Sequence, residues 1–188
     1  MTILTKSLMV LALSSSLFAG SYSVDVAHSS VGFKVKHLMI SNVKGNFKDF
    51  SGEFEYDEKS GKLVSLKGIV KAASIDTDIQ KRDDHLRSAD FFDVVKYPEI
   101  KFVLTRVSGE KAYGELSIHG VTKNIILEVE MGGSIQDPWG NTRVGLELEG
   151  KINREDYGLT WNKVLESGGV VVGKKVKLYI EIEGILQK

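Results

Sequence analysis

Apolar and polar residues alternate one by one along most of this chain, and no other feature constrains its fold as strongly. Val31, Phe33 and Val35 alternate with glycine and lysine, and the pattern returns in later segments. A period of two places successive side chains on opposite faces of a strand. Strands with one apolar and one charged face are typical of antiparallel sheets wetted on one side. The segments are 31–35, 47–56, 63–73, 100–105, 112–119, 125–131, 143–149 and 176–183.

Short turn signals separate these segments. They include Lys59-Ser60-Gly61-Lys62, Ser108-Gly109-Glu110-Lys111 and Asp137-Pro138-Trp139-Gly140-Asn141. Short strands at regular spacing predict an all-β sandwich or barrel. A closed barrel has the advantage that no strand edge stays exposed.

Residues 74–98 interrupt the alternation. Within them, residues 77–89 are rich in charge and predict a short helix or an ordered loop. Asp76 or Thr77 is the expected N-cap, because a short side-chain oxygen can accept from the free N–H groups of a first turn.

The first residues predict export. Lys6 precedes an apolar run from Leu8 to Phe18, and Ala19 and Gly20 then provide small residues for cleavage. We therefore expect a signal peptide at 1–20, a single domain at 21–188, and a periplasmic or secreted protein. The apolar run is too short for an ordinary transmembrane helix, so the mature protein is expected to lack an integral membrane span.

Composition excludes several functions. The 25 basic and 25 acidic residues balance, which argues against a nucleic-acid partner because such proteins carry a basic footprint. Cysteine is absent, which excludes thiol catalysis and cysteine-based metal sites. The mature chain is long enough to bury a core without disulfides.

Two clusters could carry chemistry, and neither pattern is specific. Arg82, Asp83, Asp84 and His85 could form a polar site, but the favoured interpretation is that Arg82 and Asp83 pair with strand ends or neighbouring loops and fix this segment on the barrel. The four histidines are scattered over separate elements, so no metal or other cofactor is expected. With no Gly-x-Ser-x-Gly elbow either, the chain is not expected to be an enzyme.

Aromatic side chains are plentiful along the predicted strands. A barrel of about eight strands is just wide enough to be filled by side chains or to hold one ligand. Periodicity alone leaves a packed core and a ligand tunnel equally open.

Motifs along the whole mature chain resemble the YceI family, described as polyisoprenoid-binding, lipocalin-like periplasmic proteins. Asn124 departs from the pattern, since a proline is expected there. The matching stretches are Tyr22-Ser23-Val24-Asp25, His28-Ser29, Val31-x-Phe33-x-Val35-x-His37, Ser74-Ile75-Asp76-Thr77, Arg82-Asp83-x-His85-Leu86, Asp90-Phe91-Phe92-Asp93, Tyr97-Pro98-x-Ile100-x-Phe102, Gly114-x-Leu116-x-Ile118-x-Gly120-Val121-Thr122-Lys123, Arg154-x-Asp156-Tyr157-Gly158-Leu159 and Val172-Gly173.

The resemblance implies an eight-stranded antiparallel, lipocalin-like barrel with a short helix or lid segment at one opening. It also implies an apolar channel for a polyisoprenoid, an isoprenoid quinone precursor or a fatty acid or amide, and often a homodimer. The alternatives are an enzyme that acts on a lipid head group through Arg82, Asp83 and His85, and a stress-related partner-binding protein with a packed core.

Strand alternation and the resemblance together predict the ligand-binding residues. The expected lining is Val31, Phe33, Val35, Phe102, Leu104, Leu127, Val129, Leu146, Leu148, Leu178 and Ile180. The residues expected at the head group are Arg82, His85, Tyr157 and Trp161.

Overall fold

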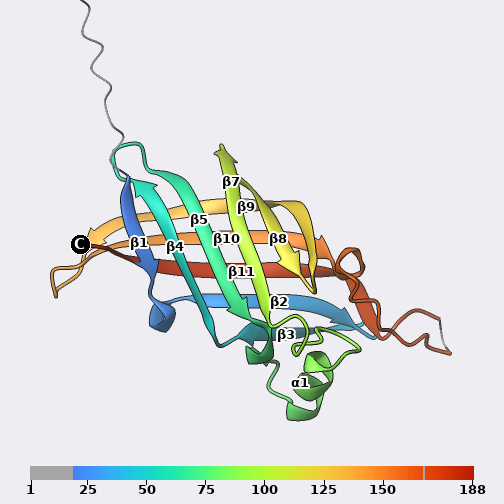
Figure 1. Ribbon diagram of the computed structural model, residues 1–188. Helices are drawn as coiled ribbons and strands as arrows, with labels where there is room; N and C mark the ends of the chain where they lie inside the picture. Colours follow the sequence, from blue (N-terminus) through green and yellow to red (C-terminus); the bar gives the residue numbers. More distant parts are fainter. Residues whose placement is uncertain (1–18, 167) are drawn as a thin grey trace, which may run out of the picture.

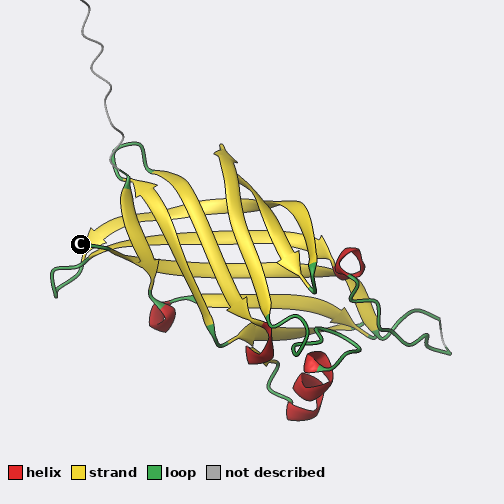
Figure 2. Ribbon diagram, viewed as in Figure 1, coloured by secondary structure: helices red, strands yellow, loops and turns green. Residues whose placement is uncertain are grey.

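The computed structural model describes residues 19–166 and 168–188. The predicted signal peptide therefore lies outside the described residues except for Ala19 and Gly20, and Gly20 is the first residue of a strand. Figure 2 shows a molecule built almost wholly from strands, with short helical turns beside them.

The strands follow the alternating segments of the sequence. They are β1 (Gly20–Val24), β2 (Ser30–His37), β3 (Ser41–Phe47), β4 (Phe50–Asp57), β5 (Lys62–Lys71), β6 (Ile75–Asp76), β7 (Glu99–Ser108), β8 (Lys111–Ile118), β9 (Val121–Gln136), β10 (Thr142–Asn153) and β11 (Val172–Leu186). In the described residues the helical elements are α1 (Gln80–Arg87) and the 3-10 turns η1 (Val26–His28), η2 (Ala72–Ser74) and η3 (Arg154–Tyr157).

Pairing between neighbours closes the sheet into an eight-stranded antiparallel barrel, as the sequence predicted. The ring runs β1-β4-β5-β7-β8-β9-β10-β11 and returns to β1. The closing pair joins the two ends of the described chain, with Tyr22 opposite Leu186 and Val24 opposite Gly184. Closure leaves β1 and β11 without a free edge at this seam.

Two strands of the barrel are broken, which alternation did not reveal. β1 and β2 both pair with one edge of β11, end to end, and η1 separates them. The predicted strand 47–56 is likewise divided between β3, which pairs with β2 and β6, and β4, which pairs with β1 and β5.

The helix α1 lies at one end of the barrel, next to β6, which pairs with the end of β3 at Asn46 and Phe47 (Figure 1). Residues 77–89 were predicted to form a short helix or an ordered loop, and the structure shows a helix over Gln80–Arg87; the predicted N-cap is wrong. The helix begins after Ile79 without a side-chain cap, because the Thr77 hydroxyl and backbone N–H both donate to the Asp83 carboxylate instead. Nowhere in residues 19–166 and 168–188 is a helix long and apolar enough to cross a membrane.

Side chains fill the half of the barrel far from α1. Tyr22 stacks on Phe54 with ring centroids 5.2 Å apart, and the Tyr22 hydroxyl donates to Glu58 at 2.8 Å. Burial and the neighbouring Glu58 carboxylate raise the pKa of Tyr22 well above its usual value. This packed cluster consists of Tyr22, Phe54, Tyr56, Leu63, Leu66, Leu104, Ala112, Leu127, Val129, Val144, Leu146 and Leu148.

Glycine makes room for the large rings of this cluster. A Cβ on Gly184 would overlap the ring of Phe54, so the ring occupies the space that a side chain would take on β11. Gly68 differs, because the atom nearest to a Cβ placed there lies at an ordinary 3.9 Å.

We expect Gly184→Ala to lower the free energy of unfolding by about 1–3 kcal/mol, because the added methyl group overpacks the Phe54 ring. Urea unfolding followed by circular dichroism measures this loss. The matched control, Gly68→Ala, should leave the unfolding midpoint unchanged or slightly higher. Equal losses in both variants would contradict the role given to Gly184.

Candidate functional site

An elongated cavity of about 200 Å³ occupies the half of the barrel nearer to α1. Its wall is almost wholly apolar. On β11 alone it extends from Val172 to Ile182, and at the helical end it reaches Leu86, Phe91 and Phe92. At about 3.4 Å per residue, the ten intervals from Val172 to Ile182 correspond to a path of roughly 34 Å along the strand.

Alternation positions this wall, as the sequence predicted. Eight of the eleven residues expected to line a channel border the cavity. They are Val31, Phe33, Val35, Phe102, Leu127, Leu148, Leu178 and Ile180. Their part in ligand binding stays a prediction.

The other three expected lining residues do not border the cavity. Leu104, Val129 and Leu146 face inward but belong to the packed cluster, where each is at most 8% exposed. Alternation determines which face of a strand a residue occupies and carries no information about depth along the barrel.

Sequence reasoning missed much of the helical end of the wall. The rings of Phe33 and Phe47 lie 5.9 Å apart, and Phe47 meets Phe92 edge to face at 5.9 Å. The Phe91-Phe92 pair lies in an irregular segment, so periodicity could not assign it to the interior. By contrast Val176 and Ile182, which also line the cavity, continue the alternation of Leu178 and Ile180 and could have been included.

Arg82, one of the residues expected at the head group, makes local hydrogen bonds that hold the structure together. Its Nε donates to the Thr77 hydroxyl at 2.7 Å and its Nη2 to the Thr77 carbonyl at 2.6 Å. Arg87 similarly donates to the Ala73 and Ile75 carbonyls. These bonds fix α1 to the end of the barrel, in line with the favoured interpretation of this charged segment.

His85 and Trp161 do come together at this end of the barrel. Their rings meet edge to face at 4.8 Å, and the His85 ring also meets Phe91 at 5.1 Å. His85 Nε2 lies 3.0 Å from a carboxylate oxygen of Asp90. Because Phe91 borders the cavity, this aromatic group adjoins the cavity at its helical end.

Tyr157 is a core residue and does not border the cavity. It is 1% exposed and packs with Leu116, Ile118, Ile152 and Leu159. Within the described residues its hydroxyl has no hydrogen-bond partner, and burial raises its pKa to about 12.

Arg154 is a buried cation beside the cavity that the sequence reading did not single out. Its Nε donates to the Gly173 carbonyl at 3.0 Å, and Nη1 donates to the Leu159 carbonyl. Burial lowers its pKa. Hardly any polar surface faces the cavity, so we assign the Arg154 guanidinium a structural role: it connects η3 and the segment after η3 to β11.

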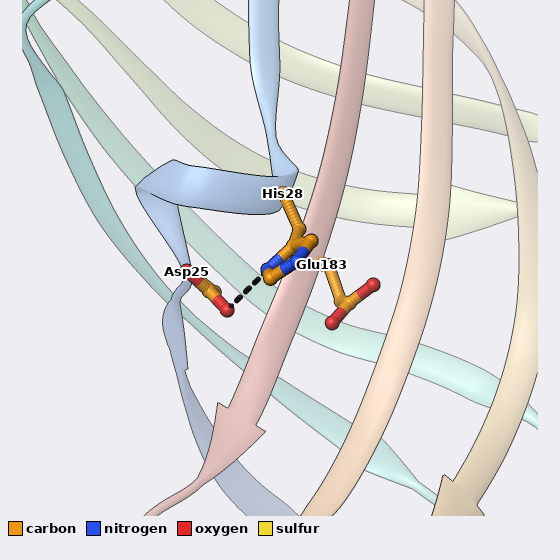
Figure 3. A group of neighbouring side chains, drawn as sticks. All are labelled: Asp25, His28 and Glu183. Carbon is orange, nitrogen blue, oxygen red and sulfur yellow. Dashed lines mark hydrogen bonds and ion pairs between the residues drawn. The ribbon is translucent and has the colours of Figure 1, made fainter. Parts of the chain in front are cut away.

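One cluster has the donor set of a metal site. Asp25, His28 and Glu183 bring their ligand atoms within 4.8 Å of one another across the closing seam (Figure 3). A guanidinium already serves these acids: Arg143 Nη1 donates to Asp25 at 2.8 Å and to Glu183, and its Nε donates to Asp137 at 2.7 Å. The cluster is therefore an ion-pair network that joins β1, β10 and β11.

A closed antiparallel barrel with an apolar cavity inside and a short helix at one end is a lipocalin-like barrel. The YceI-like domain model matches residues 22–184. A UPF0312 protein of Photorhabdus laumondii is 40% identical over 98% of this chain and 96% of its own length. The chain belongs to the YceI family.

Solved structures share the fold. The YCEI protein of Campylobacter jejuni superposes with a TM-score of 0.70 at 39% identity, covering 87% of this chain and 96% of that one. A domain from Saccharophagus degradans, described as a polyisoprenoid binding domain, superposes with a TM-score of 0.66 at 15% identity, covering 88% and 98%.

The ion-pair network predicts acid sensitivity. Arg143, and next His28, hold the pKa of Asp25 at about 2, against an ordinary value of 3.8. A lowered pKa in the folded state stabilises the protein above pH 3.8, and this contribution is lost as the pH falls toward 2. Arg143 likewise holds the pKa of Asp137 well below its usual range.

We expect Arg143→Met to lower the urea midpoint at pH 7 and to flatten its further decline between about pH 4 and pH 2. Arg106→Met is the matched control, since it also removes one positive charge but takes it from above the ring of Tyr113. If Arg106→Met lowers the urea midpoint at pH 7 by the same amount and flattens its decline in acid equally, the loss of net charge, not the loss of the network, is responsible.

Proposed function

We propose that this protein binds one long apolar chain inside its barrel and carries or stores it. The candidates are a polyisoprenoid, an isoprenoid quinone precursor and a fatty acid or amide. The observation that supports this most strongly is the apolar cavity wall, to which β11 contributes Val172, Val176, Leu178, Ile180 and Ile182.

The energetics suit such a ligand. Each methylene group removed from water contributes about 0.8 kcal/mol, so a long chain binds tightly without polar contacts. The cavity of about 200 Å³ lies below the roughly 300–1,000 Å³ of pockets for drug-sized ligands. A slender chain along the barrel therefore suits it better than a ligand with several rings.

The head group would lie outside the apolar cavity, at the helical end. His85 and Trp161 are there, and Arg82 is on the same helix as His85. We keep these three as the proposed head-group contacts. Tyr157 is removed from that proposal, because its hydroxyl is buried in the core.

The comparisons support lipid binding at a coarser level. The family and fold are of the binding type rather than the catalytic type. The polyisoprenoid binding attributed to the Saccharophagus degradans domain agrees with the proposal, although at 15% identity the likeness concerns the fold. Export to the periplasm, proposed from residues 1–20, and a homodimer would be compatible with this function.

Extraction of the purified protein with organic solvent, followed by mass spectrometry, tests the proposal. We expect a co-purifying amphiphile with a long apolar chain. Absence of any such molecule, together with no binding of a fluorescent fatty acid, would contradict it.

Two variants of the cavity wall should change binding in different ways, one by filling the cavity and one by enlarging it. Leu178→Trp puts an indole into the cavity, and we expect the affinity for a fluorescent fatty acid to fall at least about tenfold. Phe102→Ala enlarges the cavity and should shift the preferred chain length upward, at a stability cost of about 3–5 kcal/mol.

Val103→Trp is the matched control for Leu178→Trp. Val103 follows Phe102 on β7 but is 40% exposed on the outer face. Its replacement should leave the affinity unchanged. Similar losses in the inner and the outer variant would show that binding does not take place in the cavity.

A further inference from the structure

Four lysines stand directly opposite one another on the outer face of the barrel. Lys44 on β3 is opposite Lys34 on β2, Lys34 is opposite Lys177 on β11, and Lys177 is opposite Lys151 on β10. Like charges in directly opposite positions destabilise a sheet. Glu149 offsets part of this cost, since its carboxylate lies 2.9 Å from the Lys177 ammonium. Within the described residues, Lys34, Lys44 and Lys151 form no ion pair, so the row still acts against stability and calls for a functional explanation.

The outer face is divided by charge along the barrel. On β11 the outward residues near its start are lysines, whereas Glu181 lies farther along and is opposite Glu147, which is opposite Glu130. The start of β11 is the end of the barrel at which α1 lies (Figure 1). The ammonium groups of Lys34 and Lys177 also lower the pKa of Tyr179 between them, as expected in a positive field.

Two loops extend this basic face with exposed apolar side chains. Met39 and Ile40, in the turn between β2 and β3, are 54% and 84% exposed, and Val164 is 83% exposed. Leu38 and Met39 hold φ angles of 50° and 64°, a conformation that large side chains rarely adopt. The turn thus presents apolar side chains on a strained backbone, where glycine or asparagine is usual.

The two loops lie against each other. The Leu38 N–H donates to the Val171 carbonyl at 2.8 Å, and His37 is opposite Val172 where β2 pairs with β11. We call residues 36–44, 163–166 and 168–175 the basic tip. It contains five lysines and one glutamate, a net charge of +4.

The basic tip is continuous with the cavity. Val35 and Val172 line the cavity, and each adjoins or belongs to a segment of the tip. Lys36, Lys44 and Lys163 are exposed and have no carboxylate partner within the described part of the chain. A ligand that leaves the helical end of the cavity therefore passes beside a surface that combines free ammonium groups with exposed apolar side chains.

We propose that the basic tip docks on the surface of an anionic lipid bilayer. Met39, Ile40 and Val164 enter the boundary between head groups and acyl chains, while the lysines contact lipid phosphates, the two features that interfacial membrane binding combines. Exchange of the bound chain with that bilayer is the purpose of the contact, and this purpose rests on the proposed function. Docking itself rests on the tip alone.

Flotation of the purified protein with vesicles tests the proposal. Vesicles of phosphatidylcholine with about 30% phosphatidylglycerol should bind the protein, and pure phosphatidylcholine vesicles should bind it much more weakly. Raising NaCl from about 0.1 M to about 0.5 M should weaken binding through screening. Lys36→Gln, Lys44→Gln and Lys163→Gln should each weaken it roughly fivefold, and Met39→Ser with Ile40→Ser should weaken it at least about tenfold.

Matched controls lie at the far end of the barrel. Ile135→Ser with Trp139→Ser removes two exposed apolar side chains, and Lys59→Gln, Lys62→Gln and Lys111→Gln remove three exposed lysines. These variants should bind vesicles like the wild type. The proposal would be overturned if tip and control variants lose vesicle binding equally, or if the wild type binds vesicles with and without anionic lipid equally well.

Two further measurements separate the remaining outcomes. If Met39→Ser with Ile40→Ser converts a wild-type dimer into a monomer in light scattering, and the wild type does not bind vesicles, the tip is a dimer interface and the proposal fails. The tip variants should bind a fluorescent fatty acid like the wild type. If the wild type binds vesicles but no fatty acid, docking is supported and the proposed function is contradicted.

Discussion

Closure of the sheet between β1 and β11 is the constraint on which the rest of the structure depends. The pairs at Tyr22 and Val24 bring together the two ends of the described chain, and Asp25, Arg143 and Glu183 reinforce this seam from outside. Once the ring is closed, every inward side chain faces a common interior without water at an edge. The same alternation that would give an open sheet one apolar face here gives an enclosed apolar volume.

That volume is filled at one end and hollow at the other. In the filled half, rings occupy the space above glycines, as Phe54 does at Gly184. In the hollow half, the wall is lined by aliphatic side chains and phenylalanines, and α1 with the segment after it covers the end. A barrel of this size offers little more than the width of one chain, so the packed half sets a limit on the length of any ligand.

The two faces of the barrel wall differ in charge: the inner face is apolar and the outer face carries the charged side chains. Inside, the Arg154 guanidinium beside the cavity already donates to backbone carbonyls, so it is not free to act as a counterion to a head group. Outside, the row of Lys44, Lys34, Lys177 and Lys151 makes one end of the barrel basic. An apolar interior next to a basic, partly apolar rim agrees with the proposed uptake of a lipid chain at a bilayer.

Local sequence was sufficient to determine the faces of the strands. Phe33 and Leu178 were assigned to the interior from period two alone. Residues 77–89 were predicted to form a short helix or an ordered loop from their charge and the loss of that period. Local sequence did not predict how far along the barrel an inward side chain lies. Phe102 and Leu104 share one face of β7, yet only Phe102 borders the cavity. Depth depends on the tilt and stagger of the strands around the ring, which only the pairing of distant segments decides. For the same reason the lysine row was invisible in the sequence, because its four members come from four strands whose register tertiary structure alone determines.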